Sequence, residues 1–176
     1  MRPIRLIAWA ALFVLLATSI AVYPSLPADI PQHIGADGRA GRFVARSPLA
    51  WGLPLLFAIA CVVLVDVLAA KLPGKPQLFN FPGKEQLLKL PAEYRGEVIA
   101  RMQQFMDIVL LQLVATFALV QWMMWRGAQG QKNGSLTMLL LAIGPILLIA
   151  SGLYTQHIQR ALDEAQRLYD SRRRPG

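Results

Sequence analysis

Cysteine and histidine, which supply most metal ligands and many catalytic groups in proteins, are scarce in this chain of 176 residues. Cys61 is the only cysteine and lies inside an apolar run, which excludes an intrachain disulfide and a cysteine-based metal site. The two histidines, His33 and His157, are far apart, and no pair of His, Cys or carboxylate residues has metal-ligand spacing on one helix. We therefore expect no metal and no cofactor.

Catalytic sequence motifs are also missing. The chain has no Gly-x-Ser-x-Gly and no glycine-rich nucleotide turn after a strand, and the near-repeat of residues 73–75 and 82–84 lacks the glycine spacing of a phosphate loop. The net charge of +8 arises from basic residues without interleaved aromatic residues, which favours anionic lipid headgroups over nucleic acid. We expect no catalytic residues, no enzymatic activity and no nucleic-acid partner.

Long apolar runs are what the chain does have. Four of them cover residues 4–23, 49–70, 105–125 and 136–154. At ~1.5 Å per residue, helices of this length cross the ~30 Å hydrocarbon core of a bilayer. The sequence therefore predicts an all-α fold: an integral membrane four-helix bundle with cytoplasmic amphipathic helices, forming a single transmembrane domain over residues 1–176. The first run also resembles a signal peptide that ends near Ser19-Ile20-Ala21, but its length and the Tyr23-Pro24 boundary favour a retained helix.

The basic residues predict the orientation of the bundle. Thirteen of the 18 Lys and Arg residues lie in the two termini and the second connection, which four spans place on one side of the membrane. The positive-inside rule assigns that side to the cytoplasm. We expect cytoplasmic N- and C-termini, a loop at 24–48 that faces outward, a cytoplasmic connection at 71–104 and a cytoplasmic tail at 155–176.

The outward loop has the sequence of a shaped segment. Three prolines within residues 24–31 forbid a regular helix, and Asp37-Gly38 is a strong turn signal. Leu26, Ile30 and Ile34 recur every four residues, so we expect an ordered loop docked across the outer helix ends; a plain linker is the alternative. His33 is flanked by Asp29 and Asp37, and we expect its side chain to cap the loop by hydrogen bonding rather than to bind a metal.

Two cytoplasmic segments have amphipathic helical patterns. From Pro91 onward, the pattern predicts a helix that lies against the membrane surface and leads into the third span. In the tail, apolar side chains line one side and polar side chains the other, which indicates an interfacial helix with Arg172–Arg174 near anionic lipid. The alternatives for the tail are a helix packed on the cytoplasmic connection and a helix that docks a partner protein.

Two acidic residues and two glutamines inside the predicted spans, Asp66, Asp107, Gln112 and Gln121, are candidate sites because such residues are costly in lipid. Asp66 and Asp107 lie at similar depth near the cytoplasmic ends of spans two and three, and we expect headgroups, water, Lys71 and Arg101 to relieve most of their cost. Gln112 and Gln121 project to nearly opposite sides of span three, so at least one should bond to a neighbouring helix or subunit. Pro145 should kink span four.

The outward loop also carries a family resemblance. It resembles a bacterial membrane domain of unknown function that forms the N-terminal unit of SdpI-type bacteriocin-immunity proteins and occurs in short stand-alone proteins. The matching residues are Leu26, Pro27, Ile30, Pro31, His33, Gly38, Arg42-Phe43 and Arg46, and more loosely the segments 81–84 and 90–91. The resemblance implies a protein of the bacterial inner membrane. We expect the outward loop to make its contact through Pro27, Asp29, Pro31, His33, Asp37 and Gly38.

The sequence thus favours a non-enzymatic inner-membrane protein whose outward loop contacts a protein, a peptide or a lipid, as in immunity or envelope sensing. An accessory subunit of a larger membrane complex is the alternative. A small ion or proton transporter that uses Asp66 and Asp107 is less favoured, because the middle of the predicted spans carries no acid, base or histidine that would continue a pathway.

Overall fold

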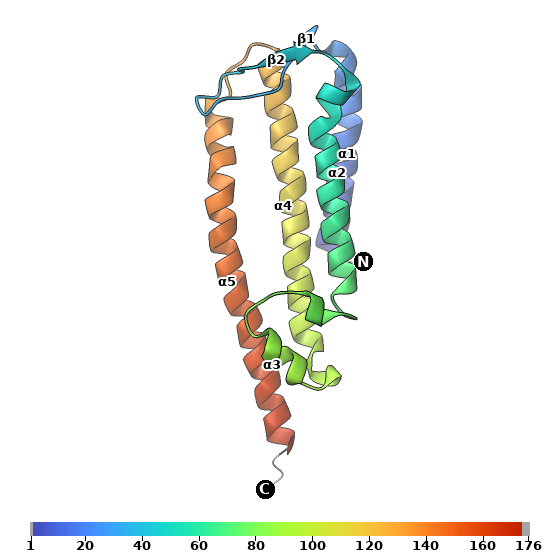
Figure 1. The fold of residues 1–176 in the computed structure, drawn as a ribbon, viewed down its shortest axis with the longest axis vertical. Helices are drawn as coiled ribbons and strands as arrows, with labels where there is room; N and C mark the ends of the chain where they lie inside the picture. Colours follow the sequence, from blue (N-terminus) through green and yellow to red (C-terminus); the bar gives the residue numbers. More distant parts are fainter. Residues whose placement is uncertain (1, 174–176) are drawn as a thin grey trace.

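The computed structural model describes residues 2–173, and long helices dominate it (Figure 1). The regular elements are α1 (Pro3–Val22), β1 (Asp29–Pro31), β2 (Phe43–Ala45), α2 (Pro48–Lys71), α3 (Lys84–Lys89), α4 (Gly96–Ala128) and α5 (Gly134–Arg173), with 3-10 turns η1 (Tyr23–Ser25), η2 (Pro76–Leu78) and η3 (Ala92–Tyr94). The predicted tail at 155–176 is therefore described as far as Arg173.

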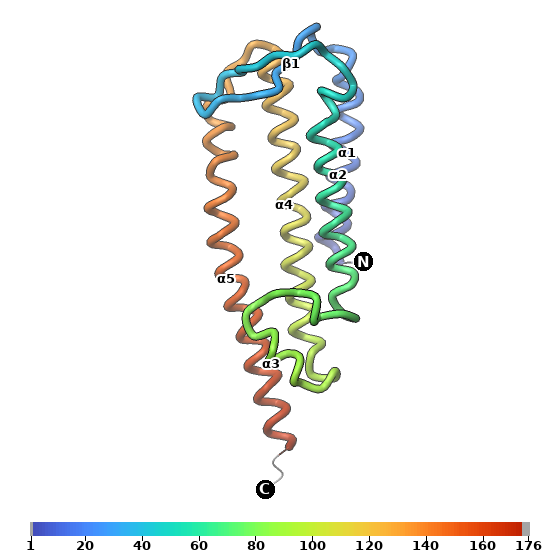
Figure 2. Tube along the Cα trace, in the orientation of Figure 1, coloured from blue at the N-terminus to red at the C-terminus, as the bar shows by residue number. Residues whose placement is uncertain are grey.

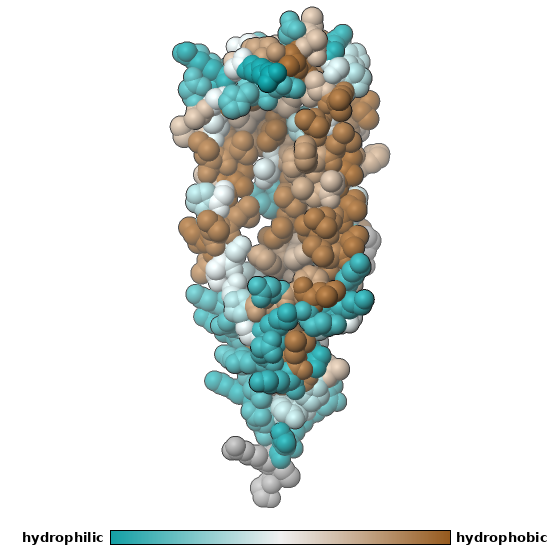
Figure 3. Space-filling model, viewed as in Figure 1, coloured by the Kyte–Doolittle hydropathy of each residue, from teal (hydrophilic) through white to brown (hydrophobic). Residues whose placement is uncertain are grey.

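The four helices α1, α2, α4 and α5 are each long and apolar enough to cross a membrane. Their apolar side chains form a broad band, with polar side chains gathered at the two ends of the molecule (Figure 3). This pattern is what a bilayer requires, since helices satisfy all backbone polar groups internally and present apolar side chains to lipid. The prediction of an all-α membrane bundle is confirmed. We call the end that carries β1 and β2 the loop end, and the end that carries α3 the tail end.

Helix α4 is the central element of the bundle and packs against both α1 and α2. Their shared core consists of Ala8, Leu12, Ala58, Val62, Leu110 and Val114. Ala8 and Ala58 are fully buried, and such small residues let neighbouring backbones approach closely inside a membrane. The tight part of the bundle therefore has three helices.

Helix α5 stands partly apart from the other three. No residue from Met138 to His157 is buried, and only 6% of the residues in the most apolar stretch of α5 are buried. Contacts with the rest of the chain lie near the two ends of the helix, as the tube in Figure 2 shows. The helix is continuous through Pro145, so this proline does not divide it into two helices.

Two predictions about the amphipathic segments are wrong. Helix α4, of 33 residues, and α5, of 40 residues, are each continuous and extend beyond a ~30 Å hydrocarbon layer at the tail end. The segment before the third span is therefore an extension of α4, and residues 155–173 do not turn to lie on a membrane surface. No glycine or proline interrupts either extension close to its span, so the helical hydrogen bonds simply continue.

The extensions instead pack on each other and on α3, which was the alternative for the tail. The core of this tail unit consists of Leu72, Leu87, Leu90, Val98, Met102, Ile158, Ala161, Leu162 and Ala165. Arg95 holds the end of α3 in place, since its guanidinium donates to the carbonyl oxygens of Leu88, at 2.8 Å, and Leu90, at 2.7 Å. The amphipathic faces thus bury one another away from the membrane band.

Candidate functional site

The loop at 24–48 contains a short antiparallel hairpin that lies across the loop end of the bundle (Figure 1). In β1 and β2, Ile30 pairs with Val44, and the Ile34–Ala40 bridge continues the pairing toward the tip. Leu26 and Ile30 are buried against Trp51 and Met124. The expectation of an ordered, docked loop is confirmed, although the hydrophobic pattern did not reveal the strands.

Pro31 and Gly38 hold the hairpin close to the end of α4. Pro31 is fully buried, and a Cβ added at Gly127 of α4 would lie 3.1 Å from its Cγ atom. Gly38 has a φ of 76° and forms the predicted turn, because its N–H donates to the Gly35 carbonyl at 2.9 Å. Its own carbonyl accepts from the Asn133 N–H at 2.8 Å. These two motif residues are buried, so they position the loop and are not accessible to a binding partner.

Arg46, the basic residue of the loop motif, connects the hairpin to the segment that follows α1. Its guanidinium donates to the carbonyl oxygens of Leu26, at 2.5 Å, and Pro24, at 3.2 Å. The same group lies 5.6 Å from the centroid of the Tyr23 ring, within the range of a cation–π contact. The hairpin is thereby fastened on the side opposite to the Gly38 contact with the α4–α5 turn.

The remaining predicted loop residues, Pro27, Asp29, His33 and Asp37, are exposed. The expected capping bond of the His33 side chain is absent among residues 2–173: the backbone carbonyl of His33 accepts from Gly41 N–H, while its imidazole bonds nothing there. The strand pairing holds the tip through the backbone, so the ring is not needed. Asp29, His33 and Asp37 do not converge into a group of three potential metal ligands in the described part of the chain.

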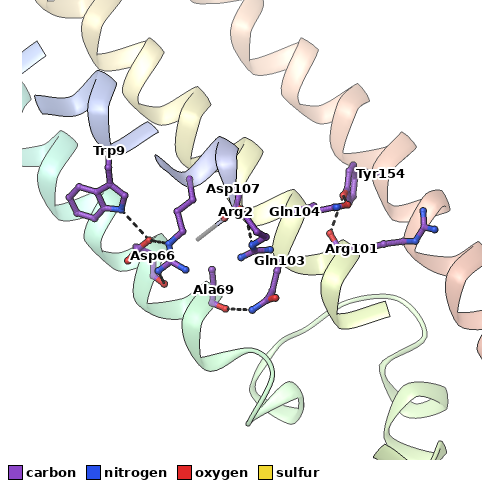
Figure 4. A network of polar contacts seen from close by, with 10 residues as sticks. Arg2, Trp9, Asp66, Ala69, Arg101, Gln103, Gln104, Asp107 and Tyr154 are labelled. Carbon is purple, nitrogen blue, oxygen red and sulfur yellow. Dashed lines mark hydrogen bonds and ion pairs between the residues drawn. The ribbon is translucent and has the colours of Figure 1, made fainter. Parts of the chain in front are cut away.

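A second polar cluster lies where α1, α2 and α4 approach the tail end (Figure 4). Asp66 of α2 accepts from the Arg5 Nε at 2.5 Å and from the Trp9 indole at 3.3 Å. Asp107 of α4 pairs with the Arg2 Nε at 3.0 Å, and its side chain is only 2% exposed. Each carboxylate is therefore paired with an arginine at the N-terminal end of α1: Arg5 within the helix and Arg2 directly before it.

These partners differ from the predicted ones, Lys71 and Arg101. Arg101 instead pairs with Glu97 at 2.7 Å and contacts the His157 ring. Arg5 lies in the first turn of α1 and Arg2 directly precedes the helix, and their side chains reach Asp66 of α2 and Asp107 of α4, respectively. Their position at the start of the first apolar run was the signal in the sequence, since it places them near the depth of Asp66 and Asp107. These two ion pairs connect the N-terminal end of α1 to α2 and α4.

Gln121 and Trp51 form a third polar contact, inside the loop-end half of the bundle. The Gln121 Nε2 donates to the Trp51 carbonyl at 3.3 Å, and the Trp51 indole donates to the Ser19 carbonyl at 2.9 Å. The prediction that at least one span-three glutamine bonds a neighbouring helix is confirmed by Gln121. Gln112 is half-buried, and its side chain has no such bond among residues 2–173.

Comparison with known proteins gives one result. Residues 10–58, which include most of α1, the hairpin and the first part of α2, match the model of a domain of unknown function (DUF1648). Neither curated proteins nor solved structures give a match. The resemblance to a domain-of-unknown-function family is thus confirmed for the segment that contains the hairpin.

Proposed function

We propose that the chain is a non-enzymatic protein of the bacterial inner membrane whose hairpin binds an extracytoplasmic protein or peptide. In this proposal the loop end faces outward, and the tail end, with most of the Lys and Arg residues, lies in the cytoplasm. On the basis of the loop motif, the proposal extends to a role in immunity or envelope sensing and to a relationship with the SdpI-type immunity proteins.

The observation that carries the proposal is the division of the hairpin into two faces. Leu26, Ile30, Pro31 and Gly38 are buried against the bundle, whereas Pro27, Asp29, His33 and Asp37 are exposed on a backbone that strand pairing and Arg46 hold in place. A loop that only closed the bundle would need the first set alone. A rigid segment that displays polar side chains loses little entropy on binding, which favours recognition.

The test is affinity purification of the full chain from native membranes in mild detergent. A double variant, Pro27→Ala with His33→Ala, should lose the co-purified partner that the wild-type chain retains. Gln32→Ala is the matched control, because Gln32 is exposed in the same hairpin but lies outside the motif. An unchanged set of co-purified proteins in the double variant would refute the proposal. Pro31→Ala is unsuitable, because Pro31 is buried and its loss would disturb the loop itself.

A second candidate is an accessory subunit of a larger membrane complex, and the exposure of α5 favours it. Most side chains of its apolar stretch are exposed, including Leu148 at 76% and Ile149 at 66%. A photo-crosslinking residue at Leu148 should then join the chain to another membrane protein, whereas the same residue at Leu56 of α2 should not. A chain that migrates alone on native gels, with no crosslinked product from Leu148, would count against this function.

A further inference from the structure

A groove runs between α1 and α4 in the loop-end half of the membrane band. Its volume is about 530 Å³, within the range of small-molecule sites. Its walls are almost entirely apolar and include Val14, Leu15 and Val22 from α1 and Ala118, Trp122 and Trp125 from α4. Nothing in the described part of the chain fills this space.

One polar side chain in the lining has an unused hydrogen-bonding atom. Gln121 is only 4% exposed, and its Nε2 already donates to the Trp51 carbonyl. Its Oε1 is buried and has no donor among residues 2–173. Two other donors of the lining are engaged elsewhere, since the Thr18 hydroxyl donates to the Val14 carbonyl and the Trp51 indole to the Ser19 carbonyl. A buried acceptor without a partner costs free energy, most of all inside a membrane.

The unpaired Gln121 Oε1 restricts which molecules can bind favourably in the groove. A helix of a second copy has its backbone N–H groups committed to its own hydrogen bonds at this depth. The ester groups of an ordinary diacyl phospholipid only accept hydrogen bonds. An occupant that satisfies both the apolar walls and Gln121 combines a hydrocarbon chain with a hydrogen-bond donor next to it.

We infer that this groove binds a single-chain amphiphile that carries an amide N–H or a hydroxyl beside its acyl chain. The chain lies against the valine, leucine and tryptophan side chains of the walls, and the donor bonds Gln121 Oε1. The site is separate from the exposed face of the hairpin, so it does not depend on the partner proposed there.

The experiment uses two brominated probes that differ in the donor alone: 9,10-dibromostearamide and methyl 9,10-dibromostearate. Three of the four tryptophans, Trp51, Trp122 and Trp125, line the groove, so bromine atoms bound there quench most of the fluorescence of the full chain in micelles. The amide should quench at a half-maximal concentration about three- to tenfold below that of the ester, the value of roughly one hydrogen bond. Equal half-maximal concentrations would overturn the inference.

Variants locate the effect. Gln121→Met should abolish the preference for the amide, while Gln112→Met, at a glutamine of α4 outside the groove lining, should retain it. Ala118→Phe fills the groove and leaves Gln121 in place, so both probes should quench more weakly. A preference that survives Gln121→Met, or unchanged quenching in Ala118→Phe, would place the binding elsewhere. The comparison of the two probes on the wild-type chain decides the matter even if a variant fails to fold.

Discussion

The carbonyl oxygen of Gly38 accepts a hydrogen bond of 2.8 Å from the N–H of Asn133, and this contact joins the two connections at the loop end. Asn133 is 1% exposed, its side-chain nitrogen donates to the Met123 carbonyl at 3.0 Å, and its own carbonyl accepts from Thr137 in the first turn of α5. The tip of the hairpin is thus connected through one residue to both α4 and α5. Because the middle of α5 has no buried residue, this contact is one of the few that set where α5 begins.

Replacement of Gly38 by alanine should loosen the loop end. A Cβ at this position would lie 2.6 Å from the Asn133 carbonyl carbon, and the positive φ adds strain. Gly130→Ala is the matched control, because Gly130 has a similar φ of 72° but open space around it. Thermal unfolding in micelles should show a clearly larger loss for Gly38→Ala than for Gly130→Ala, which should cost about 1 kcal/mol. Equal losses would mean that the Gly38 contact does not constrain the fold.

The Arg2–Asp107 pair should behave as a buried ion pair. Asp107→Leu leaves Arg2 without its partner and should lower the free energy of unfolding by about 3–5 kcal/mol, whereas adding Arg2→Met should restore part of that loss. The control is Glu97→Gln, which breaks the pair with Arg101; since the Glu97 side chain is 63% exposed, the cost should be at most about 1 kcal/mol. Unfolding titrations in mixed micelles measure all three. A double variant less stable than Asp107→Leu alone would contradict the pairing.

The stability of the tail unit should depend on the buried Leu162 and not on Leu168, which is exposed on the same helix. Leu162 is 1% exposed in the core between α3, α4 and α5, so Leu162→Ala should cost about 2–5 kcal/mol. Leu168 is 53% exposed, and Leu168→Ala should change stability by no more than about 0.5 kcal/mol. Hydrogen exchange of α3 should rise in the first variant only. If both variants exchange alike, the extension of α5 does not pack on α3.

The proposed orientation predicts a labelling pattern in intact cells. In a Cys61→Ala background, Gln32→Cys in the hairpin should react with a membrane-impermeant maleimide. Gln77→Cys, which is exposed at the tail end, should react only after the cells are permeabilised. The excess of Lys and Arg at the tail end is the physical reason, because positively charged segments are retained in the cytoplasm. The opposite pattern would invert the molecule and remove the proposed extracytoplasmic role of the hairpin.

Hydropathy alone was sufficient to predict the spans. The predicted runs at 4–23 and 49–70 differ by one residue at each end from α1 and α2. The other two runs lie inside α4 and α5 but miss their long extensions. Transfer of a side chain into lipid is a property of each residue, so it sums along the chain without knowledge of the fold. An amphipathic extension has two ways to bury its apolar face, against lipid or against protein, and local pattern does not distinguish them.

For the candidate site too, some features followed from the sequence and others did not. The loop motif predicted an ordered, docked segment, and the turn at Gly38 follows from a residue type that tolerates positive φ. The pairing of β1 with β2, the burial of Pro31 and the absence of a His33 cap did not follow, because they depend on which chain segments meet at the loop end. The roles of Asn133, Trp9 and Ser19 did not follow either, since each depends on a contact with a segment distant in sequence.

What the sequence by itself determined is the class of this protein: four helices that must cross a membrane, a loop that cannot be helical, and acidic residues near one end of two spans. The rotation and separation of the helices were decided by tertiary structure alone. They pair Asp107 with Arg2 rather than Arg101, leave the buried Gln121 oxygen without a donor among residues 2–173, and hold the middle of α5 away from α4. Partner choice depends on the positions of side chains from several helices at once, and no single segment encodes those positions.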